Sequence, residues 1–166
     1  MCIRDRCVAL SFMLSYIKLF SLPMGGSLTL CSMLPIAAYA CAFGPLYGFV
    51  AGLAFGMLQL IQDFYVIHWA QLLLDYFFAF ACYGIAAYFP NKLTLGIAVA
   101  GLCRMLCSTL SGGIFFADSA VDAGWSNAWL YSLAYNGSTI GAETVLCVLV
   151  SLLPPVKKVL GLMKSE

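Results

Sequence analysis

The sequence predicts an all-α integral membrane protein, built as one domain around a bundle of six transmembrane helices. Hydrophobic residues make up 63% of the 166 residues, charged residues make up only 9%, and the mean hydropathy is +0.98. A soluble globular domain carries about a quarter charged residues, so this chain lacks the polar groups needed to cover its own surface. The stretch from Leu19 to Gln62 has no formal charge, whereas one spanning helix needs only about 20 apolar residues. We therefore expect lipid to surround the folded chain.

Proline and glycine breaks divide the chain into the expected helices. The first helix ends before Pro23, and Pro35 falls inside the second helix, where we expect a kink. Gly44 marks the turn into the third helix, Pro90 ends the fourth, and Pro154 ends the sixth before a basic tail. Within a single membrane domain over residues 1–166, we expect helices at about residues 7–20, 28–42, 45–62, 68–89, 93–116 and 127–153, with a polar loop at 117–126.

The positive charges indicate how the chain is oriented. Arg4 and Arg6 lie at the front, Lys92 lies between the fourth and fifth helices, and Lys157 belongs to the basic tail. With six spans these places fall on one side of the membrane, which the positive-inside rule assigns to the cytoplasm. We expect both termini on that side, and the acidic loop that contains Asp118 on the other. Lys18, near the outer end of the first expected helix, is the exception to this pattern.

Away from the helix ends, three charged side chains fall inside the expected helices, and such groups are functional candidates in a membrane. They are Asp75, Arg104 and Glu143. At a rise of about 1.5 Å per residue, Arg104 lies near the depth of Glu143, so we expect these two to form an ion pair and leave Asp75 without a cation. The alternative is that Arg104 neutralises Asp75. Ser108 and Asn136 come out at the depth of Asp75, so three helices bring polar groups to one level.

Aromatic residues lie at or above the level of Asp75. They are Tyr76, Phe116, Trp125, Tyr131 and Tyr135. An anion walled by aromatic rings suits a flat organic cation, through charge pairing and cation–π contact. Tryptophan and tyrosine also form interfacial belts in membrane proteins, and some of these residues fit that role equally well. The pattern predicts a site for an organic cation that opens toward the acidic loops.

The sequence carries no motif of a catalytic site, so we expect no enzyme. G-x-S-x-G, H-E-x-x-H and a phosphate-binding loop are all missing, so any uptake against a gradient must draw its energy from a partner or an ion. Cys103 and Cys107 share a helix face, but the eight cysteines form no C-x-x-C and His68 is the only histidine. These counts favour neither a metal site nor a cofactor, and no basic patch indicates nucleic acid.

Four segments of the chain follow a known pattern in order and spacing. They are GGSLTL and SMLPI within residues 25–36, QLLLDY and AF within 71–80, LSGGIFF at 110–116, and WLYSLAYNGS at 129–138. From about Ala9 to Leu153 the chain resembles the thiamine-specific substrate-binding subunits, or S components, of energy-coupling-factor (ECF) transporters. The resemblance implies a six-helix S-component bundle in the bacterial cell membrane that captures thiamine with high affinity for uptake. It also implies docking on a transmembrane coupling protein that carries two ATP-binding-cassette ATPases.

The resemblance also implies which residues line the vitamin pocket. The positions that match are Tyr65, Asp75, Tyr76, Ser108, Gly112, Phe116, Tyr131 and Asn136. Two positions depart from the family, because Ser108 stands where most members carry a histidine and Gly26 where some carry a tryptophan. These departures leave open an S component for another small vitamin, or for a thiamine precursor or analogue. Residues 1–6 do not resemble the family, and we expect them to be a non-native start.

Overall fold

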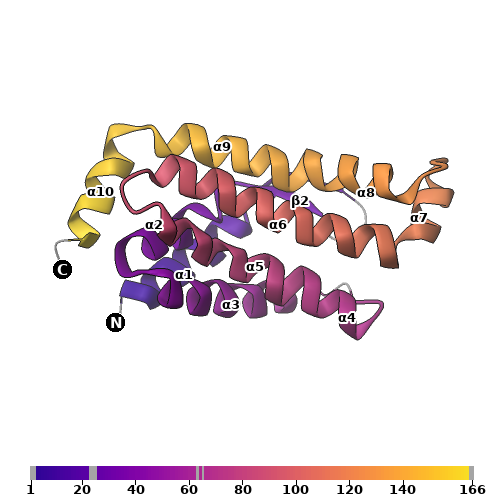
Figure 1. Cartoon of the computed structure of the whole chain (residues 1–166), viewed down its shortest axis with the longest axis horizontal. Helices are drawn as coiled ribbons and strands as arrows, with labels where there is room; N and C mark the ends of the chain where they lie inside the picture. The colour runs from indigo at the N-terminus through magenta and orange to yellow at the C-terminus, as the bar shows by residue number, and fades with distance from the viewer. Residues whose placement is uncertain (1–2, 23–25, 63, 65, 165–166) are drawn as a thin grey trace.

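The computed structural model describes residues 3–22, 26–62, 64 and 66–164 and shows a bundle of helices that run along one axis (Figure 1). Within these residues, four helical runs are long and apolar enough to cross a membrane. They are α3 (Pro45–Gln62), the run Trp69–Tyr88, α6 (Leu93–Phe115) and the run Ala128–Ser151. Two shorter helices, α1 (Ile3–Ser15) and α2 (Leu34–Phe43), complete the six expected elements. The chain is a multi-pass membrane protein, as its composition predicts.

The first two expected helices are shorter than the sequence suggests, because a β-hairpin lies between them. Strand β1 (Lys18–Ser21) pairs antiparallel with β2 (Ser27–Thr29), with Ser21 opposite Ser27. The expected helix end near residue 20 and helix start near residue 28 are therefore wrong. The proline and glycines of residues 23–26 favour a chain reversal over a helix, and the Leu22 N–H donates to the Gly26 carbonyl at 2.7 Å.

Two further expectations, the kink at Pro35 and the polar loop at 117–126, are corrected by the helices that the structure shows. Helix α2 begins at Leu34, so Pro35 lies in its first turn and kinks nothing, because a proline there gives up only an N–H that has no helical partner. The expected polar loop contains the short helix α7 (Ala117–Asp122). The basic tail forms α10 (Pro154–Lys164), which starts on a proline for the same reason.

The fourth and sixth helices each change their hydrogen-bond pattern partway. The run Trp69–Tyr88 consists of α4 (Trp69–Leu72), the π-helix η2 (Leu73–Phe78), α5 (Ala79–Ala81) and the 3₁₀-helix η3 (Cys82–Tyr88). The run Ala128–Ser151 consists of α8 (Ala128–Asn136), the π-helix η4 (Gly137–Gly141) and α9 (Ala142–Ser151). Single π-helical turns are rare inside helices and occur frequently at functional sites.

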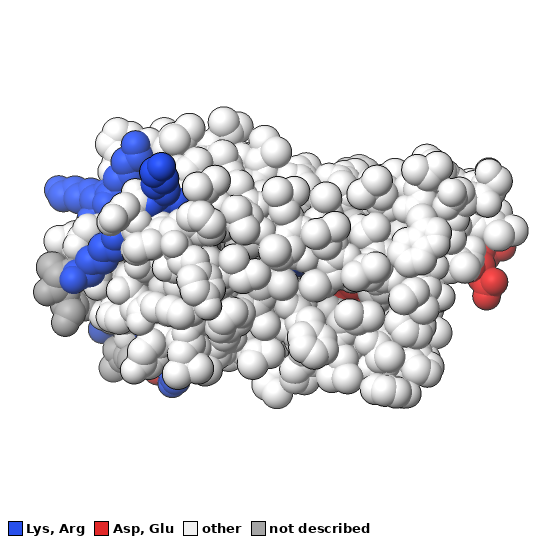
Figure 2. All heavy atoms as spheres, viewed as in Figure 1, with Lys and Arg blue, Asp and Glu red and all other residues white. Residues whose placement is uncertain are grey.

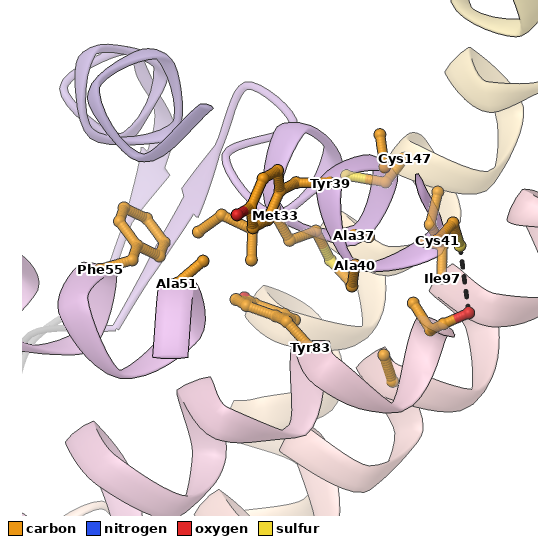
Figure 3. Close-up of a cluster of buried hydrophobic side chains, with 14 of the residues drawn as sticks. Met33, Ala37, Tyr39, Ala40, Cys41, Ala51, Phe55, Tyr83, Ile97 and Cys147 are labelled. Carbon is orange, nitrogen blue, oxygen red and sulfur yellow. Dashed lines mark hydrogen bonds between the residues drawn. The ribbon is translucent and has the colours of Figure 1, made fainter. Parts of the chain in front are cut away.

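Glycines on α3 let the fourth helix approach closely. A Cβ atom on Gly52 would lie 2.3 Å from the Phe80 carbonyl oxygen, and one on Gly56 would lie 2.1 Å from that of Tyr76. Such small residues allow two helix backbones to pack in contact in a membrane. The buried cluster beside this contact (Figure 3) is formed by Met33, Ala37, Tyr39, Ala40, Cys41, Ala51, Phe55, Tyr83, Ile97 and Cys147.

Surface charge separates along the bundle axis. Figure 2 shows lysine and arginine side chains at the end that carries α10, and acidic side chains at the end that carries α7. Helix α10 contains Lys157, Lys158 and Lys164, and α7 contains Asp118 and Asp122. The two ends of a bundle that crosses a bilayer therefore differ in charge.

Arg104 and Glu143 form the expected ion pair. The Arg104 Nη1 atom lies 3.4 Å from Glu143 Oε2, and the two side chains are only 14% and 3% exposed. The guanidinium also donates to the Tyr83 hydroxyl and lies over the Phe80 ring, 4.5 Å from its centroid. The prediction that pairs Arg104 with Glu143 rather than with Asp75 is confirmed.

The other oxygen of Glu143 connects this pair to the hairpin. Glu143 Oε1 accepts from Thr29 Oγ1 at 2.5 Å, from the Ser32 hydroxyl at 2.7 Å and from the Ser32 N–H at 3.1 Å. A buried carboxylate needs several donors of this kind. The Arg104–Glu143 network therefore ties β2 and the segment before α2 to α6, η3 and α9.

A double-mutant cycle tests this network. Arg104→Met leaves a buried anion, and Glu143→Gln leaves a buried cation while keeping an acceptor for Thr29 and Ser32. Each change alone should cost about 3–5 kcal/mol of stability, because an uncompensated charge remains in the interior. The double variant should lose at least about 1 kcal/mol less than the sum of the two. Thermal unfolding of the purified proteins in detergent measures this, with the exposed Asp118→Asn as control, and strictly additive losses would show that the two charges do not act as a pair.

Candidate functional site

A cavity lies between the hairpin, the fourth helix, α6 and the sixth helix. The centres of water-sized molecules can occupy about 160 Å³ of it, which exceeds by about tenfold the 10–15 Å³ that holds one water. Seven of the eight residues that the sequence proposes for a site line this cavity: Asp75, Tyr76, Ser108, Gly112, Phe116, Tyr131 and Asn136. The eighth, Tyr65, lies outside the described residues. The structure thus has room for a small organic molecule where the sequence predicts a site.

Asp75 is held in the cavity wall by neutral donors. Its Oδ2 atom accepts from the Ser111 hydroxyl at 2.8 Å and from Gln71 Nε2 at 3.2 Å. Gln71 is oriented in turn, because its Oε1 accepts from the Ile67 N–H at 3.0 Å. Gln71 is 2% exposed and Ser111 is fully buried, so both donors hold fixed positions behind the carboxylate.

No lysine or arginine in the described part of the chain forms an ion pair with Asp75. Arg104 lines the same cavity but forms its ion pair with Glu143. The formal charges of the three ionisable residues around the cavity, Asp75, Arg104 and Glu143, therefore sum to −1. A ligand with one positive charge would neutralise the cavity.

The local backbone explains how Asp75 and Tyr76 reach the cavity. Both residues lie in η2, and the carbonyl oxygen of Tyr76 faces Gly56 of α3. A π-helical turn uses more residues than an α-helical turn and changes which side chains share a face. The second π segment, η4, follows Asn136 directly on the opposite helix. Both π-helical segments therefore border the cavity.

The facing wall depends on a close contact between α6 and α8. A Cβ atom on Gly112 would lie 2.2 Å from Ser132 Oγ. The Ser132 hydroxyl donates to the Thr109 carbonyl at 2.9 Å, and Asn136 Nδ2 donates to the Ser132 carbonyl at 2.9 Å. Gly112 therefore contributes by its missing side chain, which lets Ser132 and Asn136 lie against α6.

Aromatic rings surround the rest of the cavity. Tyr76, Phe116, Tyr131 and Tyr135 line it, in agreement with the sequence. Trp125, which the sequence places in the same group, does not line the cavity; its ring lies 6.0 Å from that of Tyr131 and is 44% exposed. It therefore supports the wall from outside, as an interfacial tryptophan does.

Several residues of the site are absent from the sequence prediction. Gln71 precedes Asp75 by four residues and so shares its helix face, a signal that was available. Ser111 lies three residues after Ser108 on α6 and could have been predicted from this spacing in the same way. Ser27 and Thr29 come from the hairpin, and no helical periodicity points to them; Gly26, beside them in the cavity wall, is named only through the resemblance. Among the described residues, no group of three or more His, Cys, Asp or Glu side chains is placed to hold a metal ion.

Comparison with known proteins agrees with this architecture. Residues 6–162 match the family described as "Thiamine transporter protein (Thia_YuaJ)". The thiamine transporter ThiT of Bacillus subtilis (strain 168) is 31% identical over an alignment that covers 78% of this chain and 75% of that protein. A solved structure of ThiT from Listeria monocytogenes, 20% identical, shares the fold with a TM-score of 0.78 over 99% of this chain and 92% of that chain. The chain therefore belongs to the thiamine transporter protein family.

Proposed function

We propose that the cavity binds thiamine and that the chain is the substrate-capture S component of a vitamin uptake transporter. Thiamine joins a flat aminopyrimidine to a thiazolium ring that carries a permanent positive charge. The observation that carries the proposal is Asp75, a carboxylate in the cavity wall that is held by Gln71 and Ser111 and forms no ion pair with a described lysine or arginine.

The charge of the cavity favours a ligand with a single positive charge. Arg104 and Glu143 cancel each other, so Asp75 alone sets the net formal charge. An ionised group inside a membrane protein is costly unless it is paired, so a cationic ligand is stabilised there more than a neutral one. Tyr76, Phe116 and Tyr131 supply aromatic faces for a planar cation.

The proposal extends to partners and orientation. The sequence has no phosphate-binding loop, so we infer that ATP is hydrolysed by two ATPases on a transmembrane coupling protein, as the resemblance to ECF S components implies. The basic end with α10 suits the cytoplasm, and the acidic end with α7 suits the outside. The protein then captures its substrate from outside and catalyses no reaction itself.

Calorimetric titration of the purified protein tests the proposal. Thiamine should bind more tightly than either its pyrimidine half or its thiazolium half. Asp75→Asn should weaken thiamine binding at least tenfold, because a hydrogen bond to a charged group contributes about 1.5–3 kcal/mol. Asp118→Asn, an exposed change on α7, should leave the affinity unaltered.

Failure to bind thiamine at all would refute the proposed ligand. A folded Asp75→Asn protein that binds thiamine like the wild type would show instead that Asp75 is a structural acid. Thermal unfolding of the variant in detergent separates a local loss of charge from a loss of fold.

Ser108 provides a second test, because it lines the cavity at the position where the resemblance implies a histidine. If the pocket is otherwise arranged for thiamine, Ser108→His should tighten thiamine binding by about 1 kcal/mol, roughly fivefold, through an added hydrogen bond. Ser108→Ala serves as the control that removes only the hydroxyl. Weaker binding by Ser108→His would mean that the pocket is built around the serine, which favours a thiamine precursor or analogue as the natural ligand.

A further inference from the structure

Tyr135 makes a contact across the cavity that the sequence pattern does not anticipate. The N–H of Gly26 donates to the Tyr135 hydroxyl at 2.8 Å, and both residues line the cavity. Gly26 directly precedes β2, whereas Tyr135 lies on α8, so the bond joins the hairpin to the sixth helix. The Tyr135 ring lies beside that of Tyr131, with 6.1 Å between their centroids.

The ring of Tyr135 takes the space that a side chain at position 26 would need. A Cβ atom on Gly26 would lie 2.3 Å from the Tyr135 Oη atom and 2.6 Å from Cε1 and Cζ. Gly26 is not among the glycines with positive φ. A glycine is therefore required at this position by the contact with Tyr135, and not by the backbone conformation. Because the crowded atoms are the far end of a side chain, alanine at 26 would displace the ring and leave the backbone in place.

Strand β2 is consequently anchored at both of its ends. At one end Gly26 is bonded to Tyr135, and at the other Thr29 donates to Glu143 at 2.5 Å. Ser27, between these anchors, lines the cavity as well. Loss of the Tyr135 bond would loosen β2 at the Gly26 end and leave its Thr29 end attached.

We propose that Tyr135 is a ligand-positioning residue of this pocket, whose ring forms part of the wall and whose hydroxyl fixes β2 beside the bound cation. The proposal rests on the proposed function, because it takes thiamine as the ligand. It adds that the size of residue 26 and the position of Tyr135 are coupled. Only a glycine at 26 lets the Tyr135 ring stay where it contacts both the hairpin and the cavity.

Four variants distinguish the contribution of the Tyr135 ring to thiamine binding from that of its hydroxyl. Tyr135→Phe keeps the ring, removes the hydroxyl that accepts from the Gly26 N–H, and should speed thiamine dissociation roughly two- to tenfold, the range expected for one hydrogen bond. Gly26→Ala should have at least this effect, because it displaces the same ring. Tyr135→Ala should have a larger effect, and Gly26→Ala/Tyr135→Ala should dissociate no faster than Tyr135→Ala. Dissociation is followed by the change in tryptophan fluorescence on dilution into ligand-free buffer, with Tyr88→Phe and Gly161→Ala as controls away from the cavity.

Amide hydrogen exchange in the ligand-free protein tests the anchor without any ligand. Tyr135→Phe should speed exchange at the Gly26 N–H roughly two- to tenfold and leave the protection of the amides near Thr29 unchanged. Wild-type dissociation and wild-type exchange at Gly26 in Tyr135→Phe would overturn the proposal, and so would additive effects of Gly26→Ala and Tyr135→Ala.

Failure of the proposed function can be distinguished from failure of the Tyr135 contact. If the wild type does not bind thiamine, that function and the ligand-positioning part of this proposal are both refuted. The exchange at Gly26 then decides whether Tyr135 anchors β2.

Discussion

A charged side chain inside a membrane protein must be matched by an opposite charge or by enough hydrogen-bond donors, and this constraint organises the molecule. Arg104 and Glu143 meet it by pairing with each other, and Glu143 collects three further hydrogen bonds from Thr29 and Ser32. Asp75 meets it only in part, since its donors Gln71 and Ser111 are neutral. The negative charge of Asp75 is therefore not balanced by an ion pair in the fold, and a cationic ligand would supply the opposite charge.

Close helix packing places these groups around a cavity. Gly52 and Gly56 let α3 lie against the fourth helix, and Gly112 lets α8 lie against α6. Each contact brings polar atoms from two helices to one level, where a side chain on the glycine would force the helices apart. The π-helical segments η2 and η4 both contribute residues to the cavity wall, whereas the 3₁₀-helix η3 continues to the end of the fourth helix at Tyr88.

The sequence predicts those parts of the fold that depend on helical periodicity and on the cost of buried charge. It places the four long helical runs and brings Asp75, Ser108 and Asn136 to one cavity. It also pairs Arg104 with Glu143, because rise per residue converts sequence position into depth. The ends of the helices are less predictable. Apolar residues near Phe20 continue the pattern of α1, yet they form β1, because their pairing with β2 depends on residues outside the local sequence. The contact between Gly26 and Tyr135 joins residues from a hairpin and a distant helix, and no local pattern encodes it.

The central claim is that the charge of Asp75 selects a cationic ligand. Its most direct test compares thiamine with a neutral isostere, in which carbon replaces the quaternary nitrogen of the thiazolium ring, on the wild type and on Asp75→Asn. The two ligands share their shape, so their difference in affinity measures the effect of the charge, and the change of that difference in Asp75→Asn isolates the part that Asp75 contributes. The wild type should prefer thiamine by at least about tenfold, and the variant should lose most of this preference. An equal preference in both proteins would contradict the central claim, because the selection would then come from groups other than Asp75.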